Sequence, residues 1–266
     1  MAGAAISGLP ARAAGHGPLY GLATPTNGKG AWSVDDGVMG LALPDREVLM
    51  SRLMAAYGLT QDLQLSLSGR LFNRGTLRSS KTVRGLGMMP MNAVVELMGA
   101  DRFVHHDTGI GSRSEDTAYL ALDIPGGDVT RPGVFGAVAH GDVSRTWYLW
   151  EGAGYQAYAS GGSHPGDELF YSVVVGYRPK AWQLEYPKPD FRLLLELIGE
   201  AQRHGSWHGA ADPASGGDRI FLTPGVLGAY KNYGFSAGIG FPVLQDLPHG
   251  SPLQNLRFAV DVTGFV

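Results

Sequence analysis

The sequence has no cysteine and no long apolar run, and its charges nearly balance. Without cysteine the chain has neither a disulfide framework nor a thiolate site. No stretch approaches the roughly 18 consecutive apolar residues that a membrane helix needs, so any membrane span in this sequence has to be a strand. The formal net charge of −3 gives no field that attracts nucleic acid, and we expect no nucleic-acid partner.

Glycine, by contrast, supplies 40 of the 266 residues, about twice its usual share. The chain also contains 11 tyrosines, 10 phenylalanines and 5 tryptophans. Aromatic residues favour strands, and glycine permits tight turns and close approach of backbones. The composition therefore indicates β structure rather than helix.

Apolar and polar side chains alternate along much of the sequence, which is typical of strands with one apolar face. At the C-terminus, Leu256, Phe258 and Val260 share one face, whereas Arg257 and Asp261 share the other. We predict twelve strands, at 31–43, 47–59, 63–72, 91–104, 115–124, 133–141, 146–159, 168–178, 191–200, 219–230, 233–243 and 255–266. Leucine, glutamate and arginine keep a helix as the alternative for 191–200, and 51–57 has the same ambiguity.

Most connections between these runs differ in length with their parity, although the connection after 168–178 is rather long and the one after 31–43 is short. Those at 60–62, 142–145 and 231–232 are short, whereas 73–90, 201–218 and 244–254 are long and polar. Outer-membrane barrels have short turns at one end and long loops at the other. Aromatic residues near the ends of runs fit the aromatic girdles of such barrels, at Tyr57, Trp147, Tyr148, Trp150, Tyr177, Trp182, Tyr230 and Tyr233.

The predicted fold is therefore all-β, a transmembrane antiparallel barrel of about twelve strands in an up-and-down meander over residues 31–266. Residues 1–30 are rich in alanine, glycine and proline. We interpret them as a truncated signal-peptide remnant or a flexible N-terminal lead-in. A soluble β-rich binding protein is the alternative, and it would bury the same apolar faces in a shared core.

Three segments resemble the transporter-like outer-membrane barrels of Gram-negative bacteria, of the type named for the meta-pathway of phenol degradation. They are HGPLYGLATPTNGKGAWSVDDGVMG near the start, LFYSVVVGYRP, and FLTPGVLGAY…GFPVLQD within 221–246. The resemblance implies a location in the outer membrane, contact with its lipid, and a role as a passive channel or exporter. No catalytic signature is among the matching segments. The expected solute is either an aromatic or hydrophobic compound or a metal.

Charged residues on the polar phase of the strands are predicted to face the lumen of the barrel. In a narrow barrel such charges tend to form ion pairs, and the alternative is that they line a solute path. The candidates are Arg52, Arg70, Glu96, Arg178, Arg192, Glu196, Glu200, Arg257 and Asp261.

The sequence contains weak candidates for a metal site and for catalysis. His105, His106 and Asp107 have suitable ligand types, although adjacent strand residues point to opposite faces. His204 and His208 would share a face only in a helix, which Gly205 opposes. Ser144 with His140 is a conceivable nucleophile and base, but no motif supports the pair.

The function predicted from the sequence is passage of a small solute across the outer membrane, without catalysis. No phosphate-binding loop or dinucleotide fingerprint occurs, and we expect no cofactor. An outer-membrane enzyme, such as a lipase-like barrel, is the alternative within the same fold. It would be favoured by serine, histidine and a polar residue converging on one outward surface.

Overall fold

The structure is a computed structural model of the chain, and it describes residues 17–24, 26–44, 46–77, 93–101, 113–125, 129–184, 188–249, 251 and 253–266. Side chains are described throughout these ranges except at 46, 70–77, 93–101 and 113.

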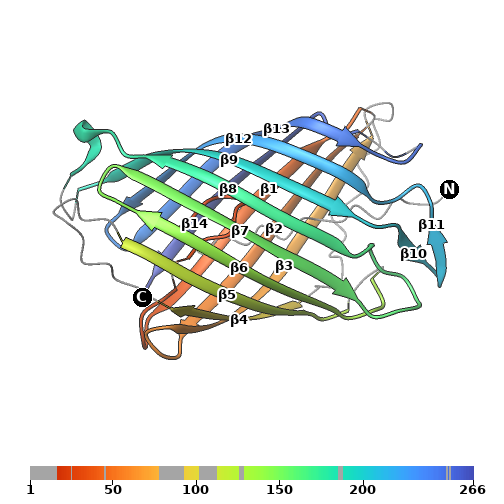
Figure 1. Cartoon of the computed structure of the whole chain (residues 1–266), viewed down its shortest axis with the longest axis horizontal. Helices are drawn as coiled ribbons and strands as arrows, with labels where there is room; N and C mark the ends of the chain where they lie inside the picture. Colours follow the sequence, from red (N-terminus) through yellow and green to blue (C-terminus); the bar gives the residue numbers. More distant parts are fainter. Residues whose placement is uncertain are drawn as a thin grey trace.

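Twelve strands in the described part of the chain form one closed antiparallel barrel (Figure 1). Each strand pairs with its neighbours in the sequence, and β1 pairs with β14 to close the sheet, so the meander predicted from the sequence is confirmed. The barrel strands are β1 (Trp32–Ala42), β2 (Arg46–Gly58), β3 (Leu63–Leu77), β4 (Ala93–Asp101), β5 (Arg113–Asp123), β6 (Gly133–Val143), β7 (Trp147–Tyr158), β8 (Glu168–Tyr177), β9 (Asp190–Gln202), β12 (Gly217–Tyr230), β13 (Tyr233–Asp246) and β14 (Leu256–Phe265).

The two ends of the barrel differ in their connections. One end, on the left in Figure 1, carries the short turns β2–β3, β6–β7 and β12–β13 and the C-terminus, and we call it the turn end. The 3₁₀ helix η1 (Lys180–Trp182) lies in the β8–β9 connection at the same end. The opposite end, the loop end, carries the β9–β12 and β13–β14 connections.

The β9–β12 connection contains a small hairpin that the sequence reading missed. Its strands are β10 (Gly205–Trp207) and β11 (Ala210–Asp212), joined at His208 and Gly209, which both have positive φ. A two-residue turn with positive φ at both positions is a tight hairpin turn. The His-Gly pair between two short runs was the available signal.

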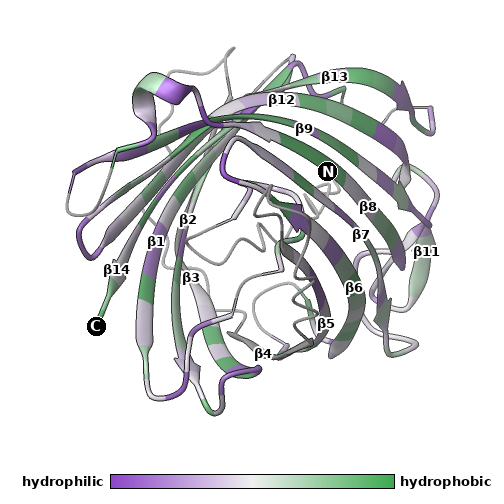
Figure 2. Ribbon diagram, turned by 60° about the vertical axis from the view of Figure 1, so that its left-hand side comes forward, coloured by the Kyte–Doolittle hydropathy of each residue, from purple (hydrophilic) through white to green (hydrophobic). Residues whose placement is uncertain are grey.

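Hydropathy alternates along the strands (Figure 2), and the apolar residues of this alternation are exposed on the outer wall of the barrel. Leu65 is 41% exposed and Val173 is 40% exposed, whereas their neighbours Gln64, Ser66, Ser172 and Val174 are buried in the interior. A soluble sandwich would bury Leu65 and Val173 in a shared core. The exposed apolar wall excludes that alternative.

Aromatic rings collect on the outer wall at the turn end. Trp32 contacts Tyr57 with ring centroids 4.6 Å apart, and Trp147 contacts Tyr177 at 4.7 Å. Amphipathic rings at the end of an apolar wall are typical of a bilayer boundary. The girdle prediction is wrong for Tyr148 and Trp150, because both lie on the interior phase of β7 and are buried.

No helix in the described residues is both long enough and apolar enough to span a bilayer.

Candidate functional site

The chain that precedes β1 lies inside the barrel. We call residues 17–24 and 26–30 the lumen segment. Leu19, Leu22, Ala23 and Thr24 are at most 1% exposed, although they belong to no strand. The sequence predicts a flexible lead-in or signal remnant over 1–30, and the described part of that range is instead packed against the inner wall.

Glu196 on β9 anchors the lumen segment through three backbone amides. The N–H of Leu19 donates to Glu196 Oε1 at 2.7 Å, and the N–H groups of Tyr20 and Gly21 donate to Oε2 at 2.9 and 3.0 Å. Glu196 is fully buried. Hydrogen bonds to an ionised carboxylate are among the strong ones, so this contact fixes three consecutive residues.

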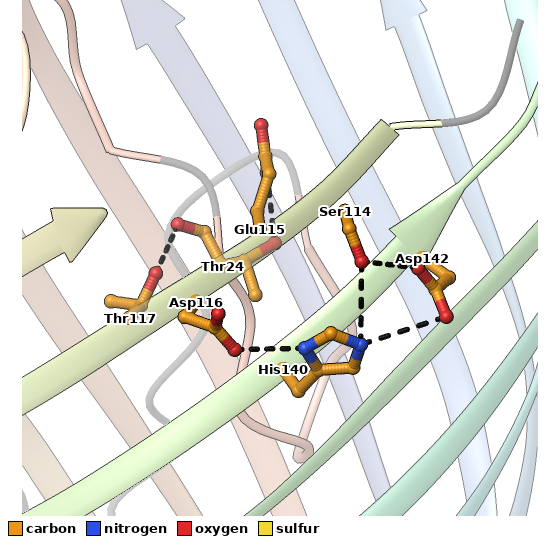
Figure 3. A network of polar contacts seen from close by, with 7 residues as sticks. All are labelled: Thr24, Ser114, Glu115, Asp116, Thr117, His140 and Asp142. Carbon is orange, nitrogen blue, oxygen red and sulfur yellow. Dashed lines mark hydrogen bonds and ion pairs between the residues drawn. The ribbon is translucent and has the colours of Figure 1, made fainter. Parts of the chain in front are cut away.

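Side chains from three further strands hold the rest of the segment. The N–H of Leu22 donates to Ser172 Oγ on β8, at 3.1 Å. On β5, Glu115 accepts a hydrogen bond from the hydroxyl of Thr24, and Thr117 donates to the carbonyl of Thr24 (Figure 3). The Asn27 N–H donates to Gln64 Oε1 on β3, at 2.8 Å. The segment is therefore attached around the inner circumference rather than along one strand.

Glycines on the inner wall make room for the segment. A Cβ at Gly238 would lie 2.5 Å from Leu19 Cδ1, and one at Gly152 would lie 2.9 Å from Leu22 Cδ1. At the turn end, a Cβ at Gly58 would lie 2.0 Å from the carbonyl oxygen of Gly28. Side chains at these positions would occupy the volume of the segment, so the glycine content of the strands is explained in part by what the barrel encloses.

An apolar cluster fills the middle of the interior. Leu19, Tyr20 and Leu22 of the lumen segment pack in one buried cluster with residues of the inner wall, among them Tyr119, Phe135, Phe170, Ile198 and Phe221. The sequence predicts charged side chains around a water-filled lumen. Glu196, Glu200, Arg257 and Asp261 do lie inside, but the interior also contains a packed apolar core to which the lumen segment contributes.

Arg257 and Glu200 form a buried ion pair beside this core. Arg257 Nη1 lies 2.7 Å from Glu200 Oε1. The guanidinium also lies 4.1 Å from the ring centroid of Tyr20 and 3.8 Å from that of Phe221. Arg257 therefore joins the wall to the lumen segment through its contact with Tyr20.

A second charged group surrounds the β1–β14 seam. Asp35 accepts a hydrogen bond from the hydroxyl of Thr263, and both side chains are buried. Arg52 on β2 interacts electrostatically with Asp35 and with Asp261. Arg52 and Asp261 thus lie in the interior beside the β1–β14 seam.

A third group lies near the turn end. Asp190 Oδ1 accepts from Arg178 Nε at 2.7 Å, and Asp190 Oδ2 accepts from Arg192 Nη2 at 3.0 Å. Arg192 also lies over the ring of Tyr148, 4.6 Å from its centroid. Arg178 follows the last residue of β8 and is not part of the strand, but its ion pair fits the predicted tendency of such charges to pair.

Two predicted lumen residues are described by their backbone only. Arg70 pairs with Arg52 in the β2–β3 register. Glu96 pairs with Ser66 on β3 and with Ala121 on β5. The predicted metal candidates His105, His106 and Asp107 lie outside the described residues.

The other histidine pair, His204 and His208, does not share a face of a helix. His204 Nδ1 contacts the carbonyl of Ser215, and the ring of His208 contacts Trp207 in the β10–β11 turn. Within the described part of the chain, no group of three or more histidine and carboxylate side chains is arranged to hold a metal ion.

A polar network on the outer wall of β5 and β6 is the feature that the sequence reading missed (Figure 3). His140 Nδ1 lies 2.8 Å from Asp116 Oδ1, and His140 Nε2 lies 3.5 Å from both Ser114 Oγ and Asp142 Oδ2. The Ser114 hydroxyl donates to Asp142 Oδ1 at 2.5 Å.

The pair of Ser144 and His140 that the sequence suggested is not formed. Ser144 Oγ accepts from the N–H groups of Thr146 and Trp147 and donates to the carbonyl of Trp147. It therefore closes the β6–β7 turn. Ser114 is 26 residues before His140, and only the β5–β6 register, with Ser114 opposite Asp142 and Asp116 opposite His140, reveals that they meet.

No protein-family model matches the chain, and no curated protein matches its sequence. Among solved structures, the chain is similar to the KdgM porin, with 12% identity, a TM-score of 0.44, and coverage of 87% of this chain and 98% of the other. It is also similar to the NanC porin, with 11% identity, a TM-score of 0.48 and coverage of 88% and 98%. The β domain of the Bordetella autotransporter BrkA is 11% identical, with a TM-score of 0.47 and coverage of 90% of this chain and 99% of the other.

The location of the chain follows from its own geometry. All strands of the barrel pair on both sides, so no edge is left, and the exposed wall is apolar between aromatic ring pairs and the loop end. Only a closed barrel allows strands to cross hydrocarbon with every backbone group paired. The chain is therefore a β-barrel that spans a membrane.

Proposed function

We propose that the barrel is an outer-membrane channel for a small solute, and that the lumen segment closes it in the arrangement described here. The proposal includes membership of the transporter-like family that the sequence resembles. In this proposal the residues of the lumen bind the solute and let it pass, and they catalyse no reaction.

One observation carries the proposal: a segment that belongs to no strand fills part of the interior, packed against the side chains of the wall. Gly152 and Gly238 leave the space that Leu22 and Leu19 occupy. A barrel that serves only as a scaffold can fill its interior with side chains of its own strands. Glycines line the wall next to the segment, and no strand pairing holds the segment in place. Both features support a lumen that opens when the segment moves.

The charged side chains of the wall support the same reading. If the segment leaves, Glu196 loses the three amides that it now binds, and Arg257 loses the ring of Tyr20. Both side chains then face the vacated volume with unsatisfied hydrogen-bonding groups. A solute with a polar group and an apolar body would satisfy the carboxylate or the guanidinium and also contact Phe221.

Single-channel recording in planar bilayers tests the proposal, with Glu196→Ala compared with the wild type. Removing the carboxylate removes three strong hydrogen bonds, so the open fraction should rise by about 10–100-fold. Glu151→Ala is the matched control, because Glu151 is an exposed glutamate on the outer phase of β7. Equal, negligible conductance of all three proteins would contradict the channel.

A further inference from the structure

The network around His140 lies on the outside of the barrel and is independent of the lumen. Ser114, Asp116, His140 and Asp142 alternate with Glu115, Thr117, Ala139 and Gly141, which are buried in the interior. The four polar side chains therefore share the outer wall. An apolar wall that faces lipid gains nothing from such a group, since charged side chains there oppose membrane insertion.

The β5–β6 register explains why these side chains meet. Ser114 is directly opposite Asp142, and Asp116 is directly opposite His140. Directly opposite and diagonal side chains on one face of an antiparallel pair are within contact distance. The two strands thus hold a serine, an imidazole and two carboxylates in a fixed arrangement without a loop.

The order of contacts is that of an activated serine. Asp116 Oδ1 lies 2.8 Å from His140 Nδ1, so a proton on Nδ1 is held by the carboxylate while Nε2 faces Ser114 and Asp142. His140 Nε2 faces Ser114 Oγ at 3.5 Å. A nucleophile, a base and an orienting carboxylate in this sequence of contacts define a hydrolytic serine site, and the nucleophile–base contact is often long without substrate.

We propose that Ser114 and His140 are the catalytic residues, and Asp116 the positioning residue, of a site that hydrolyses acyl esters of membrane glycerophospholipids. The site is separate from the lumen, so the proposal goes beyond solute passage. It departs from the expectation of a non-enzymatic barrel, and it uses Ser114 in place of Ser144.

The position on the wall selects the substrate class. Ser114 is the second residue of β5, and Asp142 is the residue before the last of β6, so the site lies toward the turn end. On the same outer wall, Leu120 and Val138 are exposed on the side toward the loop end. A substrate there must place an apolar chain against the wall and a hydrolysable polar group at the boundary, where the acyl esters of glycerolipids lie.

The reaction consumes only water. Ser114 Oγ attacks the acyl carbonyl carbon and gives its proton to His140 Nε2, and the C–O bond to glycerol breaks as that proton passes to the leaving alcohol oxygen. Water then adds to the acyl-Ser114 ester, again with His140 taking and returning the proton. The products are a fatty acid and a lysophospholipid.

Asp142 opposes the activation of Ser114 in this scheme. It accepts the Ser114 hydroxyl at 2.5 Å and lies 3.5 Å from His140 Nε2, so it competes with the imidazole for the serine proton. Rotation of the Ser114 hydroxyl from Asp142 to Nε2 prepares the attack. Removing the charge of Asp142 should therefore raise the rate.

The test uses the refolded full-length protein and two readouts. A long-chain alkyl fluorophosphonate should add once, at Ser114, as seen in the intact mass, and fatty acid should be released from phosphatidylethanolamine in mixed micelles. Ser114→Ala should lose both signals. Asp116→Asn should lower kcat by about 10²–10⁴-fold with little change in KM, because the imidazole loses its orientation.

Ser144→Ala is the matched control, and it should keep the label and the hydrolysis. Each variant should keep its heat-modifiable gel shift, which shows a folded barrel. Labelling of Ser114→Ala at the wild-type rate, or a wild type that neither reacts nor releases fatty acid, would overturn the proposal. Equal losses in Asp142→Asn and Asp116→Asn would also overturn it, since the contacts would then be an ion network only.

Discussion

Arg257 and Glu200 form an ion pair inside the barrel, with their side chains 1% and 3% exposed and 2.7 Å between Nη1 and Oε1. They come from β14 and β9, and these strands are not neighbours in the sheet. The pair therefore crosses the interior and braces two parts of the wall against each other. Because the pair is buried, replacing one partner leaves the other charge without solvent or a counter-charge.

Glu200→Gln should destabilise the barrel by about 3–5 kcal/mol, because it leaves the Arg257 charge buried without a counter-charge. The double variant Glu200→Gln with Arg257→Met removes both charges and should recover most of that loss. Urea unfolding in detergent, followed by the heat-modifiable gel shift, measures both. A double variant as unstable as the single one would show that the pair itself contributes net stability.

The lumen segment should be protected from reagents until it leaves the wall. The chain has no cysteine, so Leu22→Cys introduces a single thiol at a position that is 1% exposed. We expect it to react with a charged thiol reagent far more slowly than Ala211→Cys, which lies exposed in the β10–β11 hairpin at the loop end. Adding Glu196→Ala should accelerate only the reaction at position 22. Equal rates at both positions would contradict a docked segment.

Gly58→Ala should displace the C-terminal end of the lumen segment. An added Cβ would lie 2.0 Å from the Gly28 carbonyl oxygen and 2.7 Å from that of Asn27, and backbone atoms cannot move aside as a flexible side chain can. We expect a loss of about 1–3 kcal/mol, in the range typical of overpacking. Gly136→Ala is the control, because no atom lies within 4 Å of its Cβ position. A thermal transition lowered equally in both variants would refute this packing.

Val173→Arg should prevent insertion without affecting an internal core. Val173 faces outward near the middle of β8, where a cationic residue costs about 2–4 kcal/mol. Outer-membrane fractionation and the gel shift measure the outcome. Val173→Ala is the control, and it should insert normally. An arginine variant that inserts as well as the wild type would place this face away from lipid.

The barrel itself was predictable because one physical requirement repeats along every strand. Lipid demands an apolar side chain at each second position, so the period-two pattern was readable even at 191–200, where the composition favours a helix. The structure has β9 there, because alternate residues such as Leu195 and Glu196 face lipid and interior. The inward position of Arg257 and Asp261 follows from the same rule.

The contents of the barrel were not predictable in this way. Residues 17–24 have no period, and their position depends on tertiary hydrogen bonds to Glu196 and Ser172, which lie about 150 or more residues away in the sequence. The meeting of Ser114 with His140 depends on the exact pairing of two strands, which alternation does not specify. The inward turn of Trp150 was missed because an aromatic residue near a strand end suits a girdle as well as a core.

The seam between β1 and β14 has a consequence for assembly. The lumen segment is joined directly to the first strand, and the barrel closes only when that strand meets the last one made. The lumen segment is therefore carried to the seam together with β1. Its docking on Glu196 and the pairing of β1 with β14 bring the same end of the chain into the barrel.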